Sequence, residues 1–163
     1  MAIPCNAHVA LRHQGENHEI DERYYWESKG ALTWNDVSRL LDSPVSLWLP
    51  GYSSYSGINN RVPIDKAAGD SLYLVVVDKL ELKVGRKAPE YLDSKRSVRG
   101  RFYYKKTYYM MDVTDPAIER YYLAKSDGDY VIMNPALCIS LGDPWEGYCY
   151  KLIASVLFME RFP

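Results

Sequence analysis

The chain has 163 residues, 47% of them hydrophobic and 25% charged, and a formal net charge of −1. This composition is typical of a soluble globular protein, and the length allows one domain with a core of its own. No apolar run approaches the roughly 20 residues that cross a bilayer, and the first residues lack the pattern of a secretory signal peptide. Because three cysteines form no scaffold pattern (Cys5, Cys138 and Cys149), we expect reduced thiols and a cytoplasmic protein.

The first part of the chain shows little periodicity. We predict an N-terminal arm over residues 1–23 and a helix and loop extension over 24–66. Within the extension, a helix is predicted over 33–41, capped by Thr33, and a short strand over 46–49. A polar loop with several turn formers follows, over residues 51–63.

From residue 71 onward the pattern changes to strands. Residues 98–113 predict two antiparallel strands that turn near Lys105 and Lys106. Residues 114–125 predict a helix, because Thr114 or Asp115 can cap it and Pro116 suits its first turn. The other predicted strands cover 71–84, 130–133 with 136–141, and 149–159.

The order of these elements predicts a mainly β fold. A helix between the third and fourth of five strands is typical of the OB-fold, a partly open five-stranded Greek-key barrel. We therefore predict a single OB-like domain over residues 24–163, with the barrel over 71–159. The alternative is a general antiparallel sheet with one packed helix.

Basic and aromatic side chains gather in residues 95–109, KRSVRGRFYYKKTYY, which contain six basic residues, five aromatic residues and no acid. In an OB-fold this segment falls on the loop and strands that bind ligands. Single-stranded nucleic acids are held by cations that contact phosphates and by rings that stack on bases. The candidate contacts are Arg86, Lys87, Tyr91, Lys95, Arg96, Arg99, Arg101, Tyr103, Lys105, Lys106, Tyr109 and Trp145.

Strand alternation divides these rings. It predicts Phe102 and Tyr104 inside the barrel and Tyr103 outside, with Tyr109 as a second outer ring. The alternative is a structural hairpin whose basic residues are only solvated. Residues 51–63 provide possible loop contacts or a polar connector, and the candidates there are Tyr52, Tyr55, Asn59, Asn60 and Arg61.

Catalytic and metal sites are weakly indicated. Cys5, His8, His13 and His18 have ligand-like gaps, but the four residues between the two pairs are too few for a usual zinc finger. Cys138 and Cys149 lie in apolar strands without an activating group. We expect no metal, no cofactor and no enzymatic activity.

Several spaced segments resemble the C-terminal half of the prokaryotic dual-OB domain family. They read RYYWESKG, LTWNDVSRLLDSPVSLWLPGYSSYSGINNRVP, SLYLVVV, VTDPAIERYYL and LCISLGDPWEGYCYKLIASVL, and the similarity extends from about residue 15 to 158. The resemblance implies an OB-fold in a bacterial conflict or defence system, with nucleic-acid or nucleotide binding and no activity of the domain itself. Because the family has two consecutive barrels, we expect either a stand-alone barrel or a partner, such as a second copy, in place of the first.

The sequence thus favours a non-catalytic module that binds single-stranded nucleic acid or a nucleotide. One alternative is a protein-interaction or oligomerisation module that uses its Tyr-rich face, since aromatic and Arg side chains are also enriched at interfaces. A nucleic-acid-processing enzyme is the third hypothesis.

Overall fold

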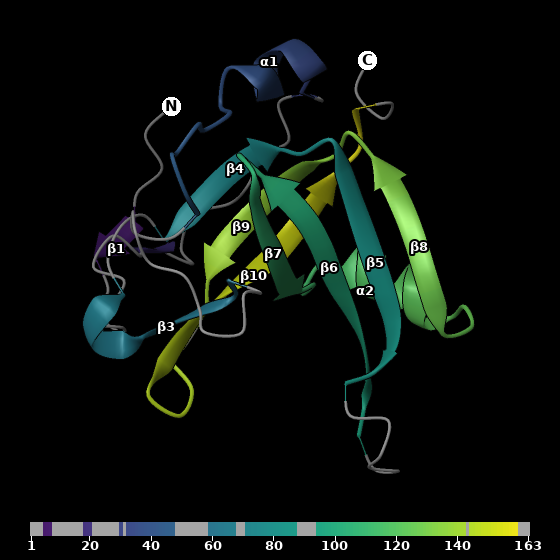
Figure 1. Cartoon of the computed structure of the whole chain (residues 1–163). Coiled ribbons are helices and arrows are strands. Elements are labelled where there is room, and N and C mark those ends of the chain that lie inside the picture. The colour runs from purple at the N-terminus through teal and green to yellow at the C-terminus, as the bar shows by residue number, and fades with distance from the viewer. Residues whose placement is uncertain are drawn as a thin grey trace.

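Two bent ribbons of chain organise the fold (Figure 1). The computed structural model describes residues 5–7, 18–20, 30, 32–47, 59–67, 71–87, 94–142 and 144–159. Along one ribbon run β4 (Leu72–Val76) and β5 (Lys79–Arg86), and along the other run β8 (Gly128–Met133) and β9 (Ala136–Leu141). β4 pairs with β9 and β5 pairs with β8, both antiparallel.

Each ribbon contributes to two sheets, and this divides one of the predicted strands. The strand predicted over 71–84 is interrupted at Val77 and Asp78. At this bend Val77 N donates to Pro135 O at 3.2 Å and Asn134 N donates to Asp78 O at 2.9 Å, so the two ribbons turn together. A strand that passes from one curled sheet to the next has to bend, and periodicity alone does not mark where.

The predicted hairpin is confirmed. β6 (Arg96–Tyr104) and β7 (Thr107–Asp112) pair from Arg99 with Asp112 to Tyr104 with Thr107. Lys105 and Lys106 form the two-residue turn, with φ values of 44° and 69°. A two-residue turn with both φ values positive matches the right-handed twist of the flanking strands.

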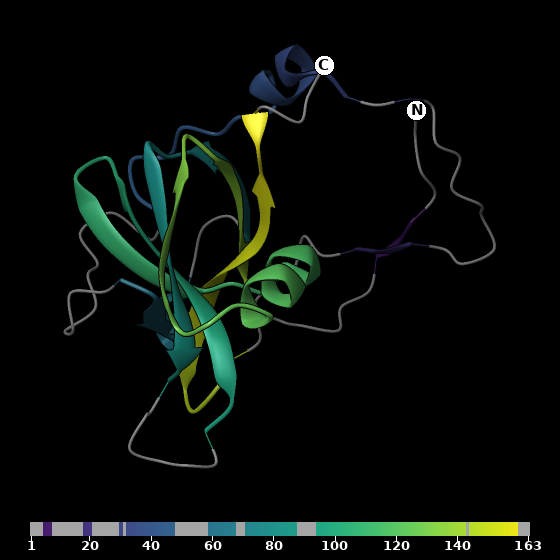
Figure 2. The ribbon, with the colours of Figure 1, turned by 90° about the vertical axis from the view of Figure 1, so that its right-hand side faces the viewer.

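Both predicted helices exist, and each is shorter than predicted. α1 (Trp34–Ser38) begins after Thr33, whose side chain and that of Asp36 form a capping box. α2 (Pro116–Leu123) begins after Asp115, which settles the choice between Thr114 and Asp115 as the cap. α2 contacts β5 and β6 and lies on the side of the strands away from the tip of the β6–β7 hairpin (Figure 2).

The last strand, β10 (Tyr148–Leu157), joins the two sheets. It pairs with β9 on one side and with β3 (Arg61–Pro63) on the other, so the strand orders are β3-β10-β9-β4 and β7-β6-β5-β8. A parallel bridge links Val113, just after β7, to Ile153 of β10, and Thr114 N donates to Ile153 O at 2.9 Å. The described chain is therefore mainly β, with two α-helices and curled sheets that are consistent with an OB-like barrel.

Residues of the predicted extension pack against the same core. Val37 and Leu47 are buried, and Leu47 belongs to the core cluster with Val62 of β3. Asp42 N donates to Leu74 O at 2.7 Å, and Asp42 Oδ2 accepts from Leu74 N at 2.7 Å. Of the strand predicted over 46–49, Ser46 and Leu47 are not in a strand, and the other two residues lie outside the described part.

Three short elements complete the description. β1 (Cys5–Ala7) and β2 (His18–Ile20) pair with each other, Cys5 opposite Ile20 and Ala7 opposite His18. A 3₁₀ turn, η1 (Ile64–Lys66), follows β3. Among the residues that the structure describes, no helix has the length and apolar character needed to cross a membrane.

Gly100 of β6 leaves room for buried side chains of β5 and β10. A Cβ atom at this position would overlap the Cδ1 atoms of Ile153 and Leu80. Because both side chains are fully buried, neither can move away freely. We expect Gly100→Ala to lower the free energy of unfolding by about 1 to 3 kcal/mol, measured by chemical denaturation. An unchanged denaturation midpoint would contradict this account of the core.

Candidate nucleic-acid interface

The outward side of the β7-β6-β5-β8 sheet forms one continuous surface, which we call the outer face. Strand alternation places every second residue there, because Leu80, Leu82, Phe102 and Tyr109 point into the core. Register then sets neighbours side by side, such as Glu81 with Arg101 and Val131. The outer face consists of Lys79, Glu81, Lys83, Arg99, Arg101, Tyr103, Tyr108, Met110, Asp112, Asp129, Val131 and Met133.

Two tyrosines form its aromatic part. Tyr103 is 66% exposed and lies opposite Tyr108 on β7, with ring centroids 5.4 Å apart and planes tilted by 56°. Burial raises the pKa of the Tyr108 hydroxyl, although the nearby Arg101 charge opposes the shift. Tyr108 therefore stays protonated at neutral pH and offers a neutral ring with a hydrogen-bonding group.

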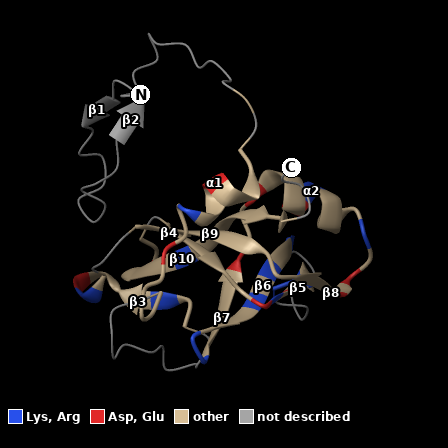
Figure 3. Cartoon of the chain, turned by 90° about the horizontal axis from the view of Figure 1, so that it is seen from above, with Lys and Arg blue, Asp and Glu red and all other residues tan. Residues whose placement is uncertain are grey.

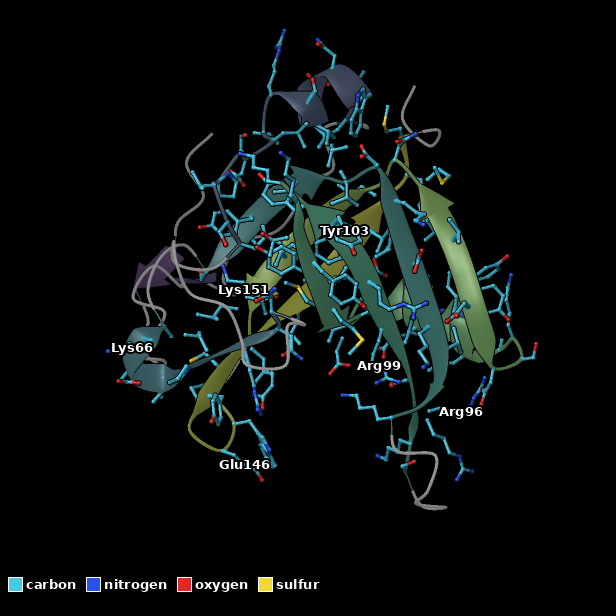
Figure 4. All side chains as sticks on the ribbon, in the orientation of Figure 1. Lys66, Arg96, Arg99, Tyr103, Glu146 and Lys151 are labelled. Carbon is cyan, nitrogen blue, oxygen red and sulfur yellow. The ribbon has the colours of Figure 1, made fainter. Side chains whose placement is uncertain are left out.

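A shallow pocket opens beside these rings. Its volume is about 210 Å³, and it is lined by Asp78, Lys79, Glu81, Arg101, Phe102, Tyr103 and Tyr108. The pocket therefore combines the exposed ring of Tyr103 and the partly buried ring of Tyr108 with cations and carboxylates in its lining. Figure 4 shows Tyr103 and Arg99 one above the other along β6.

Charges on the outer face nearly balance. Four cations (Lys79, Lys83, Arg99 and Arg101) share it with three carboxylates (Glu81, Asp112 and Asp129), and both signs lie over β5, β6 and β7 in Figure 3. The strongly basic surface predicted from the sequence is therefore weakened by acids on neighbouring strands, which register brings across from distant parts of the chain.

Two of the predicted phosphate contacts, Arg101 and Lys87, are engaged in ion pairs. Arg101 lies 3.4 Å from Glu81 and 3.2 Å from Asp129, and Lys79 lies 2.6 Å from Glu81. The hydrogen bond from Lys79 is the main cause that lowers the pKa of Glu81. Lys87 pairs with Asp112. These pairs are exposed enough that a stronger ligand charge can exchange with them.

The structure corrects the predicted role of Arg96. Its guanidinium donates to Leu123 O, Lys125 O and Asp127 Oδ1, each at 2.7 Å. All of these acceptors follow or end α2, so Arg96 holds the C-terminal end of the helix in place. Lys105 is also engaged, since its ammonium donates to Ser43 O at 2.9 Å and to Ser43 Oγ at 3.0 Å.

Other predicted cations lack a partner within the described part of the chain. Lys95, Arg99 and Lys106 form no ion pair there, and Arg99 Nε is buried without a hydrogen-bond partner. Lys83 is a fourth such cation, directly opposite Arg99, and it was not among the contacts predicted from the sequence. The alternation in KLELKV could have found it, because Leu80, Leu82 and Val84 on one side place Lys83 on the other. Arg86, the remaining predicted cation, differs from these four, because at the exposed end of β5 it takes part in an interaction.

The second predicted outer ring was wrong. Tyr109 is only 1% exposed and stacks on Phe102 inside the core. The two-residue turn at Lys105 and Lys106 puts Tyr109 opposite Phe102, so Tyr108 is the ring beside Tyr103. The division of Phe102, Tyr104 and Tyr103 into inner and outer rings is confirmed.

Tyr109 instead anchors the segment after α1. Its hydroxyl contacts Ser46 Oγ at 3.1 Å and accepts from Leu47 N at 3.2 Å. We expect Tyr109→Phe to cost about 1 to 2 kcal/mol of unfolding free energy, because the buried Leu47 N–H loses its acceptor. Denaturant titration measures the loss, and oligonucleotide affinity should stay unchanged. Unchanged stability of Tyr109→Phe would contradict the anchoring role of the hydroxyl.

Of the predicted loop contacts, those that the structure describes are engaged within the fold. Asn59 is buried and its Nδ2 donates to Tyr108 O at 2.8 Å, while Asn60 O accepts from Lys151 N at 3.1 Å. The Arg61 guanidinium lies 4.4 Å from the ring centroid of Tyr148. These contacts favour the connector interpretation for this end of the loop. Trp145 is exposed in the turn before β10, as predicted; Tyr52, Tyr55 and Tyr91 lie outside the described residues.

Among the described residues, thiols and metal-ligating groups add no further site. Burial raises the pKa of Cys149, and burial followed by the Asp42 charge raises that of Cys138, so both thiols favour their protonated form. The described residues contain no group of three or more metal-ligating side chains. His8 and His13 lie outside the described part, which leaves the predicted absence of a metal at Cys5 to His18 a prediction.

Comparison with known proteins gives one finding. No curated protein and no solved structure matches the chain. A family model described as a dual OB-containing domain matches residues 1–156, which covers both the N-terminal arm and the curled sheets. The protein therefore belongs to the dual OB-containing domain family.

Proposed function

We propose that this protein is a non-catalytic OB module whose outer face binds single-stranded nucleic acid or a nucleotide. Tyr103 carries the proposal, because an exposed ring on the second strand of such a barrel offers a stacking platform. Tyr108 and the pocket beside it supply the rest of a base site.

Strand pairing supports the barrel on which the proposal depends. If β4 with β5 and β8 with β9 each count as one bent strand, the pairs form a path through β6, β7 and β10 that returns to its start. That path has five strands, and α2 falls between the third and the fourth. This order supports the proposal of a five-stranded Greek-key barrel of the OB type.

Lys83 and Arg99 supply the phosphate contacts in this proposal. They lie opposite each other on β5 and β6, two positions along each strand from the pocket residues Glu81 and Arg101. If a base stacks on Tyr103, the phosphate backbone attached to it can run along β6 toward Lys83 and Arg99. Their lack of described partners means that a phosphate would replace water there rather than an existing ion pair.

Titration of labelled oligonucleotides at two salt concentrations tests the proposal. Because only a few cations on the outer face lack a partner, we expect about two or three phosphate contacts and a correspondingly shallow decrease of affinity with salt. The double variant Lys83→Glu with Arg99→Glu should weaken binding at least about tenfold.

A matched control reverses two charges elsewhere. Lys66→Glu with Arg120→Glu changes the net charge equally, at η1 and on α2, and should leave affinity within about twofold. Equal losses in both double variants would mean non-specific attraction. No binding to any single-stranded DNA, RNA or nucleotide at low salt would overturn the proposal.

The proposal that the protein has no catalytic activity has its own test. In the part of the chain that the structure describes, neither thiol is activated, and the family resemblance suggests no activity of the domain itself. We expect no cleavage or modification of nucleic acid or nucleotides during incubation with Mg²⁺ or Mn²⁺. We place the protein in the cytoplasm because its cysteines form no scaffold pattern, and in a prokaryotic defence context because of the family resemblance.

A second candidate, a protein interface on the same face, is favoured by one observation. Val131 and Met133 are large apolar side chains exposed on β8, beside a charge-balanced surface. Aromatic and Met side chains with few net charges are typical of interface cores. Met133→Lys should then abolish self-association or partner binding, measured by analytical ultracentrifugation, and leave oligonucleotide affinity unchanged.

A further inference from the structure

Three tyrosine rings surround one ammonium group at the C-terminal end of α2. The Lys125 Nζ atom lies 4.3 Å from the ring centroid of Tyr121 and 5.3 Å from those of Tyr122 and Tyr130. Tyr121 and Tyr122 meet edge to face at 5.0 Å, and Tyr122 and Tyr130 are tilted at 5.2 Å. We call these three rings the tyrosine cage.

Sequence spacing explains only part of this cluster. Tyr121 and Tyr122 lie four and three residues before Lys125, so one helical turn brings them near it. Tyr130 comes from β8, across a turn, and has no such reason to contact the ammonium. Three faces from two elements therefore converge on a single cation, which exceeds the ordinary pairing of a helical Lys with one ring.

The cage is held in shape by bonds that do not involve Lys125 Nζ. The Tyr130 hydroxyl donates to Ser126 O at 2.9 Å. Arg96 holds the backbone oxygens of Leu123 and Lys125 together with Asp127. Tyr122 is buried in the core. Removing the Lys125 side chain should therefore leave the three rings in place, as a preorganised cation site.

The geometry points to a binding site for a methylated or quaternary ammonium group, which Lys125 occupies when no ligand is present. Ring faces attract cations through their quadrupoles, and the attraction increases as the cation loses water. A lysine ammonium is compact and strongly hydrated. Because a methylated ammonium keeps the charge and has fewer N–H groups to hydrate, it loses less hydration on entering the cage and competes with Lys125 for it.

Surrounding groups agree with a cation site. A hydrogen bond with the Tyr121 hydroxyl is the main cause that raises the pKa of Lys125. A pocket of about 440 Å³, lined by Asp115, Ala117, Ile118, Tyr121, Tyr122, Val156 and Phe158, shares two rings with the cage. A ligand with a methylated ammonium at one end could place the rest of its chain along this pocket.

Tetramethylammonium chloride is the first probe, and the shifts of the tyrosine ring protons in NMR spectra are the readout. We expect weak saturable binding by the natural chain and at least about tenfold tighter binding by Lys125→Ala, because the resident cation is gone. Tyr121→Ala in the Lys125→Ala background should remove binding, since Tyr121 is exposed and its loss should spare the core. Tyr103→Ala, on the outer face, is the matched control and should change nothing.

Two further sets of titrations identify the class of ligand and test whether the shifts are a general effect of salt. Choline and a short peptide with one trimethyl-lysine are compared for affinity. Tighter binding of choline indicates a small ligand, and tighter binding of the peptide indicates a modified chain. Ammonium chloride at equal concentration should not produce the saturable shift. The inference would be overturned if tetramethylammonium failed to bind Lys125→Ala. It would also be overturned if ammonium chloride shifted the tyrosine signals as tetramethylammonium does, or if the added Tyr121→Ala substitution left the shifts unchanged. These outcomes are independent of oligonucleotide binding on the outer face.

Discussion

Asp115→Ala is expected to lower the free energy of unfolding by about 2 to 5 kcal/mol, from a lost helix cap of about 1 to 2 and an unpaired buried donor of about 1 to 3. Asp115 Oδ1 accepts from Ala117 N at 2.9 Å and Ile118 N at 3.1 Å. Its Oδ2 accepts from Val156 N at 3.0 Å and from Ser155 Oγ at 3.1 Å. One carboxylate thus joins the start of α2 to β10.

Asp115→Asn separates the two halves of this role. Asparagine caps helices well, so Oδ1 bonds to Ala117 and Ile118 should persist. An amide NH₂ toward Val156 N–H would instead oppose a donor with a donor. We expect a loss smaller than that of Asp115→Ala, measured by denaturant titration. Equal stability of the natural chain and Asp115→Asn would contradict the link to β10.

The pH dependence follows from the same bonds. Burial by itself would raise the pKa of Asp115, but the hydrogen bonds from Val156, Ile118, Ala117 and Ser155 outweigh it and lower the pKa below its usual 3.8. A lowered folded-state pKa adds stability above the unfolded-state value and loses it as pH falls through the folded-state value. The stability gap between the natural chain and Asp115→Asn should therefore be complete above about pH 5 and shrink in more acidic solution.

Tyr103→Ala is expected to weaken binding of single-stranded oligonucleotides about tenfold or more, because stacking one base on an aromatic ring contributes about 1 to 3 kcal/mol. Tyr103 is largely exposed, so its removal should change unfolding free energy by less than about 1 kcal/mol. Tyr103→Phe keeps the ring and should retain most of the affinity. Fluorescence anisotropy at low salt measures all three proteins.

Tyr121 provides the matched control for this prediction. It is 58% exposed, close to the 66% of Tyr103, but it lies on α2 rather than on the outer face. Tyr121→Ala should leave oligonucleotide affinity unchanged. Equal losses from the two alanine variants would show that exposed rings bind without regard to place, and no loss from Tyr103→Ala would remove Tyr103 from the site.

Local sequence signals predicted much of the fold. Pro116 after Asp115 located α2, the Thr33 cap located α1, and the alternation of Phe102, Tyr103 and Tyr104 gave their inner and outer sides. The break between residues 133 and 136 was predicted, but the bend at Val77 could not be, because it arises where one strand passes between two sheets. Such a requirement belongs to the assembled barrel and leaves no local pattern.

The candidate site was harder to predict than the fold. Tyr109 was assigned to the wrong side because one residue of hairpin register exchanges the two faces of a strand. Arg96 looked like a surface cation because its acceptors, Leu123 O and Lys125 O, are backbone atoms more than 25 residues away. Counting basic residues in 95–109 also missed Glu81 and Asp129, which pairing brings beside Arg101.

The most direct measurement of the central claim is an NMR titration of the full chain with a single-stranded oligonucleotide of about eight nucleotides. The backbone amide signals show which residues the ligand contacts. We predict the largest shifts at Lys83, Arg99, Tyr103 and Tyr108, with little change along α2. Shifts confined to α2, or no shift at any oligonucleotide concentration at low salt, would contradict binding on the outer face.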